Sequence, residues 1–227
     1  MALKFTGLKQ IDGSISHKKE EKRWTELIDA VMEGKVIPVI GADFLIDNNE
    51  DNVGNLHQQI VDALASAYDV KSRPESFSQL AYDKDFLYGT NYEVEAIYEK
   101  IDELLNQVVD EGQLSPNKLM MKLLKLRKFP FVITTSFTPV VEMAMREAWP
   151  DKKVRVLQFC NDPNFNRTVG KGDIESELDM NLPTVYYMFG KYSDNKSYVV
   201  TDMDMMEYCK KWISGGSSAP RVLTAVI

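Results

Sequence analysis

Three short segments carry the residue types best suited to chemistry, and each follows an apolar run. Gly41–Phe44 comes after a β-branched run, and its small residues would let a phosphate approach the backbone closely. Thr134–Thr138 brings hydroxyl groups to the point where a helix is expected to begin, and the free N–H groups of a helix N-terminus favour anions. Met188–Gly190 places a glycine after an aromatic run. For a bound nucleotide, these segments predict the contacting residues to be Gly41, Ala42, Asp43, Phe44, Thr134, Thr135, Ser136 and Gly190.

Each segment also has a purely structural explanation. A Gly-Ala pair often ends a strand, so Gly41–Ala42 alone is weak support for a ligand loop. Thr134–Thr138, taken alone, is explained more simply as the cap of the helix that Pro139 enters. Phe189 is explained most simply as a core residue. The secondary structure around these segments is therefore needed to choose between a ligand-binding role and a structural one.

Predicted strands and helices alternate along the chain. The short apolar runs predict strands at Val36–Ile40, Phe129–Thr135, Val154–Phe159, Pro183–Phe189 and Tyr198–Thr201. Apolar residues at helical spacing predict helices at Lys19–Glu33, Asn55–Tyr68, Ser76–Phe86, Asn91–Val109, 115–128, 138–149 and 202–212. The first strand is expected to be buried on both faces, although Pro38 cannot donate a ladder hydrogen bond. The alternation predicts an α/β fold, a mostly parallel sheet with helices on both faces.

The composition of the chain excludes several classes of binding partner. The chain has 227 residues, of which 44% are hydrophobic, and this suits one domain of generous size. Its net charge of −7 argues against a nucleic-acid surface, which needs clustered Lys and Arg. No apolar run approaches the length of a membrane span, and the N-terminus lacks the apolar core of a secretory signal. We expect no nucleic-acid or membrane partner and a cytoplasmic location.

Cysteine and histidine are scarce, which limits metal binding and acid–base catalysis. Cys160 and Cys209 cannot form a four-cysteine zinc site, so neither zinc nor another metal is expected. The acidic run Asp47–Asp51 is explained as a surface turn rather than a cation site. An imidazole general base would have to be His17 or His57. His17 lies in a polar leader, whereas His57 lies near a helix start and could approach the strand ends in space.

The chain is expected to divide into a leader at 1–18, a main domain at 19–213 and a tail at 214–227. Within the main domain, residues 161–181 form a polar stretch without periodicity, predicted to be a loop or small insertion. The tail begins as a Gly- and Ser-rich linker and ends in an apolar run, as if a further element started there. Self-association, or contact with other domains of a longer chain, is therefore expected.

Taken in order, four segments resemble the sirtuin-like (silent-information-regulator-like) domains of bacterial defence proteins. Lys35–Phe44 is similar to the strand and Gly-Ala-Gly loop of that family, and Phe131–Thr138 is similar to its Thr-Thr-Asn-Tyr-Asp segment. Val185–Gly190 lies where the family has an apolar strand that ends in His-Gly, and Tyr198–Asp202 is similar to the segment that follows. The resemblance covers roughly residues 24–212. It implies a Rossmann-like domain that binds NAD.

The resemblance also implies which residues would be catalytic, and these are substituted here. Ser136 stands where active members have the Asn that holds the ribose, and Phe189 stands where they have the His that assists cleavage. Thr138 replaces the Asp of the same motif. Asp43 is the third residue of the glycine loop, where a carboxylate would repel a pyrophosphate unless it were paired. Phenylalanine can neither transfer a proton nor bind a ribose hydroxyl.

Two hypotheses follow, and a third stays open. The first is a catalytically degenerate sirtuin-like domain that serves as a binding or scaffold module in a larger protein. The second is a divergent NAD⁺ hydrolase, because a cationic nicotinamide leaving group needs little acid catalysis; Ser136, Thr135 and Asp43 are its candidate residues. Deacetylation is not expected, since the zinc module is missing. The third is a Rossmann-like domain for another nucleotide.

Overall fold

The computed structural model describes residues 13–42, 56–112, 114–158, 182–192 and 198–213. The chain forms two compact units, Met1–Val36 and Ile37–Ile227. The predicted loop at 161–181 and the tail at 214–227 lie outside the described residues, as does most of the predicted leader. The first unit contains helix α1 (Gly13–Met32), which begins earlier than the predicted Lys19. A glycine at position 34, with φ of +71°, follows its end.

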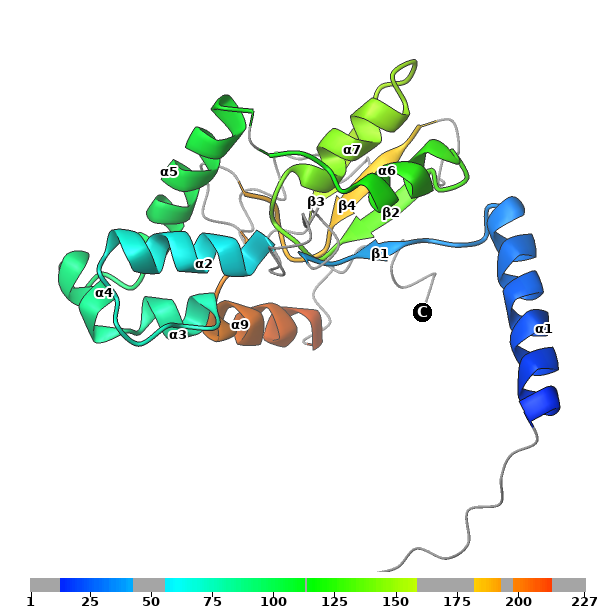
Figure 1. Ribbon diagram of the computed structural model, residues 1–227. Helices are drawn as coiled ribbons and strands as arrows, with labels where there is room; N and C mark the ends of the chain where they lie inside the picture. Colours follow the sequence, from blue (N-terminus) through cyan, green and yellow to red (C-terminus); the bar gives the residue numbers. More distant parts are fainter. Residues whose placement is uncertain (1–12, 43–55, 113, 159–181, 193–197, 214–227) are drawn as a thin grey trace, which may run out of the picture. The chain divides into compact units, whose positions relative to one another are not determined.

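The second unit is built on a parallel sheet (Figure 1). Its strands are β1 (Val39–Ile40), β2 (Phe131–Thr134), β3 (Arg155–Gln158) and β4 (Thr184–Tyr187), in the order β1-β2-β4-β3. All neighbouring pairs are parallel. The predicted α/β fold with a mostly parallel sheet and flanking helices is therefore confirmed.

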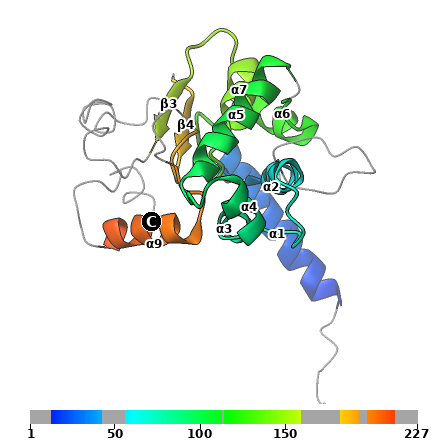
Figure 2. The ribbon, with the colours of Figure 1, turned by 90° about the vertical axis from the view of Figure 1, so that its left-hand side faces the viewer.

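Helices cover both faces of this sheet (Figures 1 and 2). On one face, Phe131, Ile133 and Tyr186 form a buried cluster with Leu157 and with Tyr208 of α9 (Asp202–Ile213). Side chains alternate between faces along a strand, so the next residue in each strand points the other way. On this opposite face, β4 contacts α7 (Val140–Ala148), which packs beside α6 (Lys118–Lys125). The core thus has two halves, one on each side of the strands.

A group of helices is inserted between β1 and β2. They are α2 (Leu56–Ala67), α3 (Phe77–Ala81), α4 (Lys84–Gly89) and α5 (Ala96–Asp110), with α2 packed against α3 and α5. The single helix predicted at Ser76–Phe86 is wrong because Asp83 starts a new one. Its Oδ1 accepts a hydrogen bond from the Asp85 N–H at 2.8 Å, the arrangement of an N-cap. The insert places the N-terminal turn of α2 near the sheet.

The first and last predicted strands differ from the structure. Only Val39–Ile40 is strand, and Val39 is 61% exposed because β1 lies at one edge of the sheet in the described part of the chain. Pro38 fits such an edge: its carbonyl accepts the Ile133 N–H at 2.9 Å, and its missing N–H breaks no described pairing. Tyr198–Thr201 contains no strand; Thr201 instead forms the N-terminal cap of α9 with Asp204.

Candidate functional site

The three segments predicted to carry chemistry meet at the carboxyl edge of the sheet. β1, β2 and β4 are neighbours, so the residues after them lie side by side. The Thr135 N–H donates to the Ile40 carbonyl at 3.1 Å, and the Met188 N–H donates to the Thr134 carbonyl at 2.9 Å. A Cβ built on Gly41 would lie 3.5 Å from Thr135 Oγ1, an ordinary contact. The expected juxtaposition is present, at the edge where α/β folds bind ligands.

Thr134 joins two of these strand ends. It is fully buried, and its Oγ1 donates to the Ile40 carbonyl at 3.1 Å. The same oxygen accepts the Ser136 N–H at 3.1 Å. Thr134 therefore holds the end of β1 against the turn that follows β2. Its hydroxyl therefore forms hydrogen bonds to backbone groups in this structure.

Ser136 has a saturated hydroxyl. The residue is 1% exposed, and its Oγ lies 3.0 Å from His57 Nε2 and 3.0 Å from Thr138 Oγ1. The Thr138 N–H also donates to this oxygen at 3.2 Å. A serine hydroxyl has one proton to donate and two lone pairs to accept with, so three contacts use its full capacity. We refer to His57, Ser136 and Thr138 as the Ser136 cluster.

His57 contacts the predicted site, although it was not among the residues predicted to contact a nucleotide. It lies in the first turn of α2, and its ring stacks on Phe137 with centroids 4.7 Å apart and planes at 17°. Phe77 meets the same ring edge-on at 5.6 Å. Phe137 is itself buried and packs against Tyr198 at 4.9 Å. These aromatic contacts fix the imidazole, and the available signal was a histidine at the start of the helix after the glycine loop.

Phe189 lies away from the Ser136 cluster. It is half-buried against the cluster formed by Phe131, Ile133, Leu157, Tyr186 and Tyr208, and its ring meets that of Tyr208 edge-on at 5.1 Å. These belong to the face that α9 covers. Phe189 thus packs against the apolar core, which agrees with its simpler, structural explanation.

The glycine positions have different roles. Gly190 is buried and has φ of +84°, a conformation that strains any side-chain-bearing residue. Gly41 and Ala42 are half-buried directly after β1, and Gly41 lacks a positive φ. Asp43 and Phe44 lie outside the described residues. Gly190 is therefore explained by the turn it makes, whereas Gly41 is not required by backbone geometry.

Glu142, in the first turn of α7, forms ion pairs with two basic residues. Lys191 Nζ donates to Glu142 Oε2 at 2.5 Å, and Arg146 Nη2 donates to the other carboxylate oxygen at 2.8 Å. Burial raises the pKa of the Glu142 carboxyl, but the hydrogen bonds from Lys191 and Arg146 outweigh burial and lower that pKa overall. Burial, together with the charge of Glu142, raises the pKa of Tyr187 well above its usual range. Tyr187 therefore keeps its proton, which its hydroxyl donates to the Thr138 carbonyl at 3.3 Å.

Glu142→Gln is expected to make the free energy of unfolding fall less steeply as the pH is lowered. The pKa of the Glu142 carboxyl is lower in the folded protein than in the unfolded chain, where it is ordinarily near 4.5. Ionised Glu142 therefore stabilises the fold fully above the unfolded-state pKa, and this stabilisation is lost as the pH falls through the folded-state pKa. Urea midpoints of both proteins, measured between pH 6 and pH 3, should fall further for the wild type. Equal slopes would show that Glu142 gains nothing from Lys191 and Arg146 on folding.

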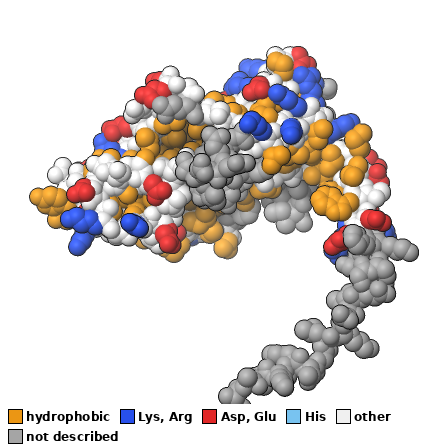
Figure 3. Space-filling model, viewed as in Figure 1, with side chains coloured by type: hydrophobic (Ala, Val, Ile, Leu, Met, Phe, Trp, Pro, Cys, Tyr) orange, Lys and Arg blue, Asp and Glu red, His pale blue; other side chains and the backbone are white. Residues whose placement is uncertain are grey.

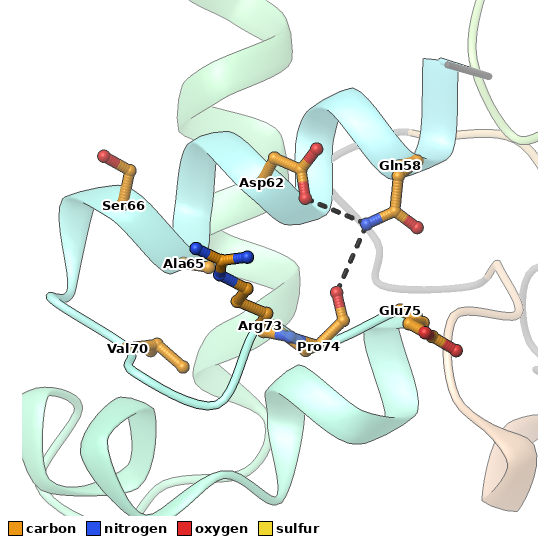
Figure 4. Close-up of a pocket in the computed structure, with 8 residues that line it drawn as sticks. All are labelled: Gln58, Asp62, Ala65, Ser66, Val70, Arg73, Pro74 and Glu75. Atoms are coloured by element: carbon orange, nitrogen blue, oxygen red, sulfur yellow. Dashed lines mark hydrogen bonds between the residues drawn. The ribbon is translucent and has the colours of Figure 1, made fainter. Parts of the chain in front are cut away.

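A separate pocket of about 460 Å³ lies beside α2 (Figure 4). Its rim combines Arg73 with the acidic Asp62 and Glu75. Gln58 Nε2 donates to Asp62 Oδ1 at 2.9 Å and to the Pro74 carbonyl at 3.2 Å, which ties the helix to the following loop. Arg73 has φ of +54°, an uncommon value for a residue with a side chain. Its lining also includes Ala65 and Val70, and no predicted site residue lines it.

The described residues contain neither a metal-binding cluster nor a membrane-spanning helix. Among them, no group of three or more His, Cys, Asp or Glu side chains could hold a metal ion. No helix in the described ranges is long and apolar enough to cross a membrane.

Comparison of the sequence with models of known protein families, and with curated proteins, gives no match. The sirtuin-like resemblance thus rests on the four sequence segments that carry it. Two of them, Phe131–Thr138 and Val185–Gly190, lie on neighbouring strands of the sheet. NAD binding and NAD cleavage both stay predictions.

Proposed function

We propose that this chain is a sirtuin-like α/β domain that binds NAD without cleaving it and serves as a binding module within a larger protein. The observation that carries the proposal is the saturated hydroxyl of Ser136. In the resemblance, this residue stands at the position of the Asn that holds the ribose. A side chain committed to His57 and Thr138 has no hydrogen-bonding capacity left for a substrate.

The cost of freeing Ser136 supports the same conclusion. Turning its hydroxyl toward a ribose would leave the Thr138 N–H without its partner, and Thr138 is fully buried. An orphaned buried donor costs about 1–3 kcal/mol. Phe189, at the position of the family His, packs against the core and offers no proton. The residues at both positions that are catalytic in the family, Ser136 and Phe189, thus have structural contacts here and do not support cleavage of NAD.

Binding would use backbone rather than side chains. The carboxyl edge of β1, β2 and β4 offers the small residues Gly41 and Ala42 beside Thr135. Thr135 is half-buried, and its hydroxyl makes no hydrogen bond to the described residues. A pyrophosphate that accepts bonds from backbone N–H groups needs no catalytic side chain. A cytoplasmic location would supply the NAD.

Isothermal titration calorimetry of the full chain with NAD tests the binding half of the proposal. We expect measurable heat of binding, and we expect Gly41→Glu to abolish it because a carboxylate at the loop would repel the pyrophosphate. Lys84→Gln, on the exposed face of α4, is a matched control and should bind as the wild type does. Heat with ATP but not with NAD would point to another nucleotide. No heat with either would reject nucleotide binding.

A divergent NAD⁺ hydrolase is a second candidate, favoured by one observation. His57 Nε2 lies 3.0 Å from Ser136 Oγ, within reach for an imidazole to take the hydroxyl proton. The histidine would approach the reaction from α2 instead of from the end of β4. Under this alternative, His57→Gln should lower nicotinamide release about 100-fold or more, whereas Lys84→Gln should not change it.

A further inference from the structure

The pocket beside α2 contains an arginine that has no ion-pair partner (Figure 4). Arg73 lines this cavity of about 460 Å³, a volume typical of small-molecule sites. Its guanidinium is exposed and makes no ion pair with any described residue, although Asp62 and Glu75 line the same pocket. A guanidinium in this position can bind an anionic group of a ligand.

The loop that carries Arg73 is held on both sides. Ser72 Oγ donates to Asp83 Oδ2 at 2.6 Å, and the Pro74 carbonyl accepts the hydrogen bond from Gln58 Nε2 at 3.2 Å. Between these two anchors Arg73 has φ of +54°, although a residue before proline normally has extended backbone. A conformation of this kind persists only where its surroundings hold it, and such residues cluster at binding sites. The loop therefore fixes the backbone of Arg73 beside the pocket.

Asp62 offers the opposite charge from α2. Its Oδ1 accepts a hydrogen bond from Gln58 Nε2 at 2.9 Å, and its second carboxylate oxygen has no hydrogen bond to the described residues. Asp62 and Arg73 do not pair with each other, so a ligand that carries both charges can bridge them. Glu75 points away from Arg73 (Figure 4). The pocket thus presents one basic and one acidic group to a ligand.

Three aliphatic residues line the same pocket. They are Ala65, Val70 and Pro74, of which Ala65 and Pro74 are buried and Val70 is half-buried. An apolar part of a ligand would lose contact with water against them, which favours binding. The surface around the pocket carries both signs of charge, since Figure 3 shows Lys and Arg side chains among Asp and Glu side chains over α2, α3 and α4. Such a surface has no strong attraction for a polyanion.

We propose that this pocket binds a free amino acid with an aliphatic side chain. The ligand's carboxylate accepts hydrogen bonds from Arg73, whose planar guanidinium matches the geometry of a carboxylate. The ligand's ammonium donates to Asp62, and its side chain lies against Ala65 and Val70. A phosphate fits less well, because Asp62 and Glu75 would repel its second negative charge.

Titration of the ¹⁵N-labelled full chain with L-leucine, followed by two-dimensional NMR, tests the proposal. We expect saturable shifts of the Arg73 and Asp62 amide signals. Leucinamide lacks the carboxylate and N-acetylleucine lacks the ammonium. Each analogue should bind about tenfold more weakly or worse than L-leucine, the effect of losing one charge-assisted hydrogen bond.

Charge-removing variants locate the two contacts. Arg73→Gln and Asp62→Asn should each raise the Kd for L-leucine about tenfold or more. Lys71→Gln and Asp69→Asn remove the same charges from the loop after α2 at residues that do not line the pocket, and they should leave the Kd unchanged. The amide spectrum of each variant shows whether it is folded.

Four results would overturn the proposal. L-Leucine could fail to shift the Arg73 and Asp62 amides, or either analogue could bind as tightly as L-leucine. Arg73→Gln or Asp62→Asn could keep the wild-type Kd while folded. Inorganic phosphate could shift the same amides where L-leucine does not, which would indicate a simple anion site. The titrations contain no NAD, so their outcome is independent of nucleotide binding.

Discussion

Replacing Phe137 with alanine is expected to lower the free energy of unfolding by about 3–5 kcal/mol, the usual cost of truncating a buried aromatic side chain. Phe137 is 2% exposed and lies between the insert and the sheet. It stacks on His57 and contacts Phe77 and Tyr198. Its loss would therefore leave a cavity shared by α2, α3 and the segment before α9.

Urea unfolding at pH 7 measures this effect. Phe137→Leu keeps most of the volume and should cost clearly less than the alanine variant. Tyr88→Ala, which truncates a 76% exposed aromatic ring, is the matched control and should stay within about 0.5 kcal/mol of the wild type. A change below about 1 kcal/mol for Phe137→Ala would mean that Phe137 is not a core residue.

Replacing Ser136 with alanine is expected to cost about 1–3 kcal/mol of stability. The variant removes the oxygen that accepts the Thr138 N–H and leaves that buried donor without its partner. It also removes the hydrogen bond between Ser136 Oγ and His57 Nε2. The effect should be largely structural, because the hydroxyl is committed to these contacts in the structure.

The control for Ser136→Ala is its neighbour. Thr135→Val removes a hydroxyl of similar size that makes no hydrogen bond to the described residues, and it should change stability by less than about 0.5 kcal/mol. Urea unfolding of the two variants should therefore differ by at least the cost of one orphaned donor. Equal stability would show that the Ser136 cluster is not fixed as the structure has it.

The sheet could be predicted from sequence because its strands are short apolar runs between polar turns. Phe131–Thr134 and Thr184–Tyr187 each lie within a predicted run, and the helices between the runs leave only parallel pairing. The same pattern cannot tell an edge strand from a central one, since both are rich in β-branched residues. Val39 was expected to be buried and is exposed; Pro38 was the signal that β1 lies at an edge.

The candidate site was predicted in part. The strand ends follow from topology, so Gly41 and Thr135 could be placed together in advance. The contact between His57 and Ser136 joins residues 79 positions apart and depends on how α2 packs against β2. No local pattern encodes that packing. Two features of the sequence indicated that His57 could reach the site: histidine is scarce in this chain, and His57 lies at the start of the helix after the glycine loop.

Release of nicotinamide from NAD tests the central claim most directly. The full chain, incubated with NAD and followed by chromatography, should release no more nicotinamide than a buffer blank, because the hydroxyl of Ser136 is committed to His57 and Thr138. Sustained release by the wild type that is lost in Ser136→Ala would contradict the account. The Ser136 cluster would then be a catalytic centre, and the divergent hydrolase would be the correct function.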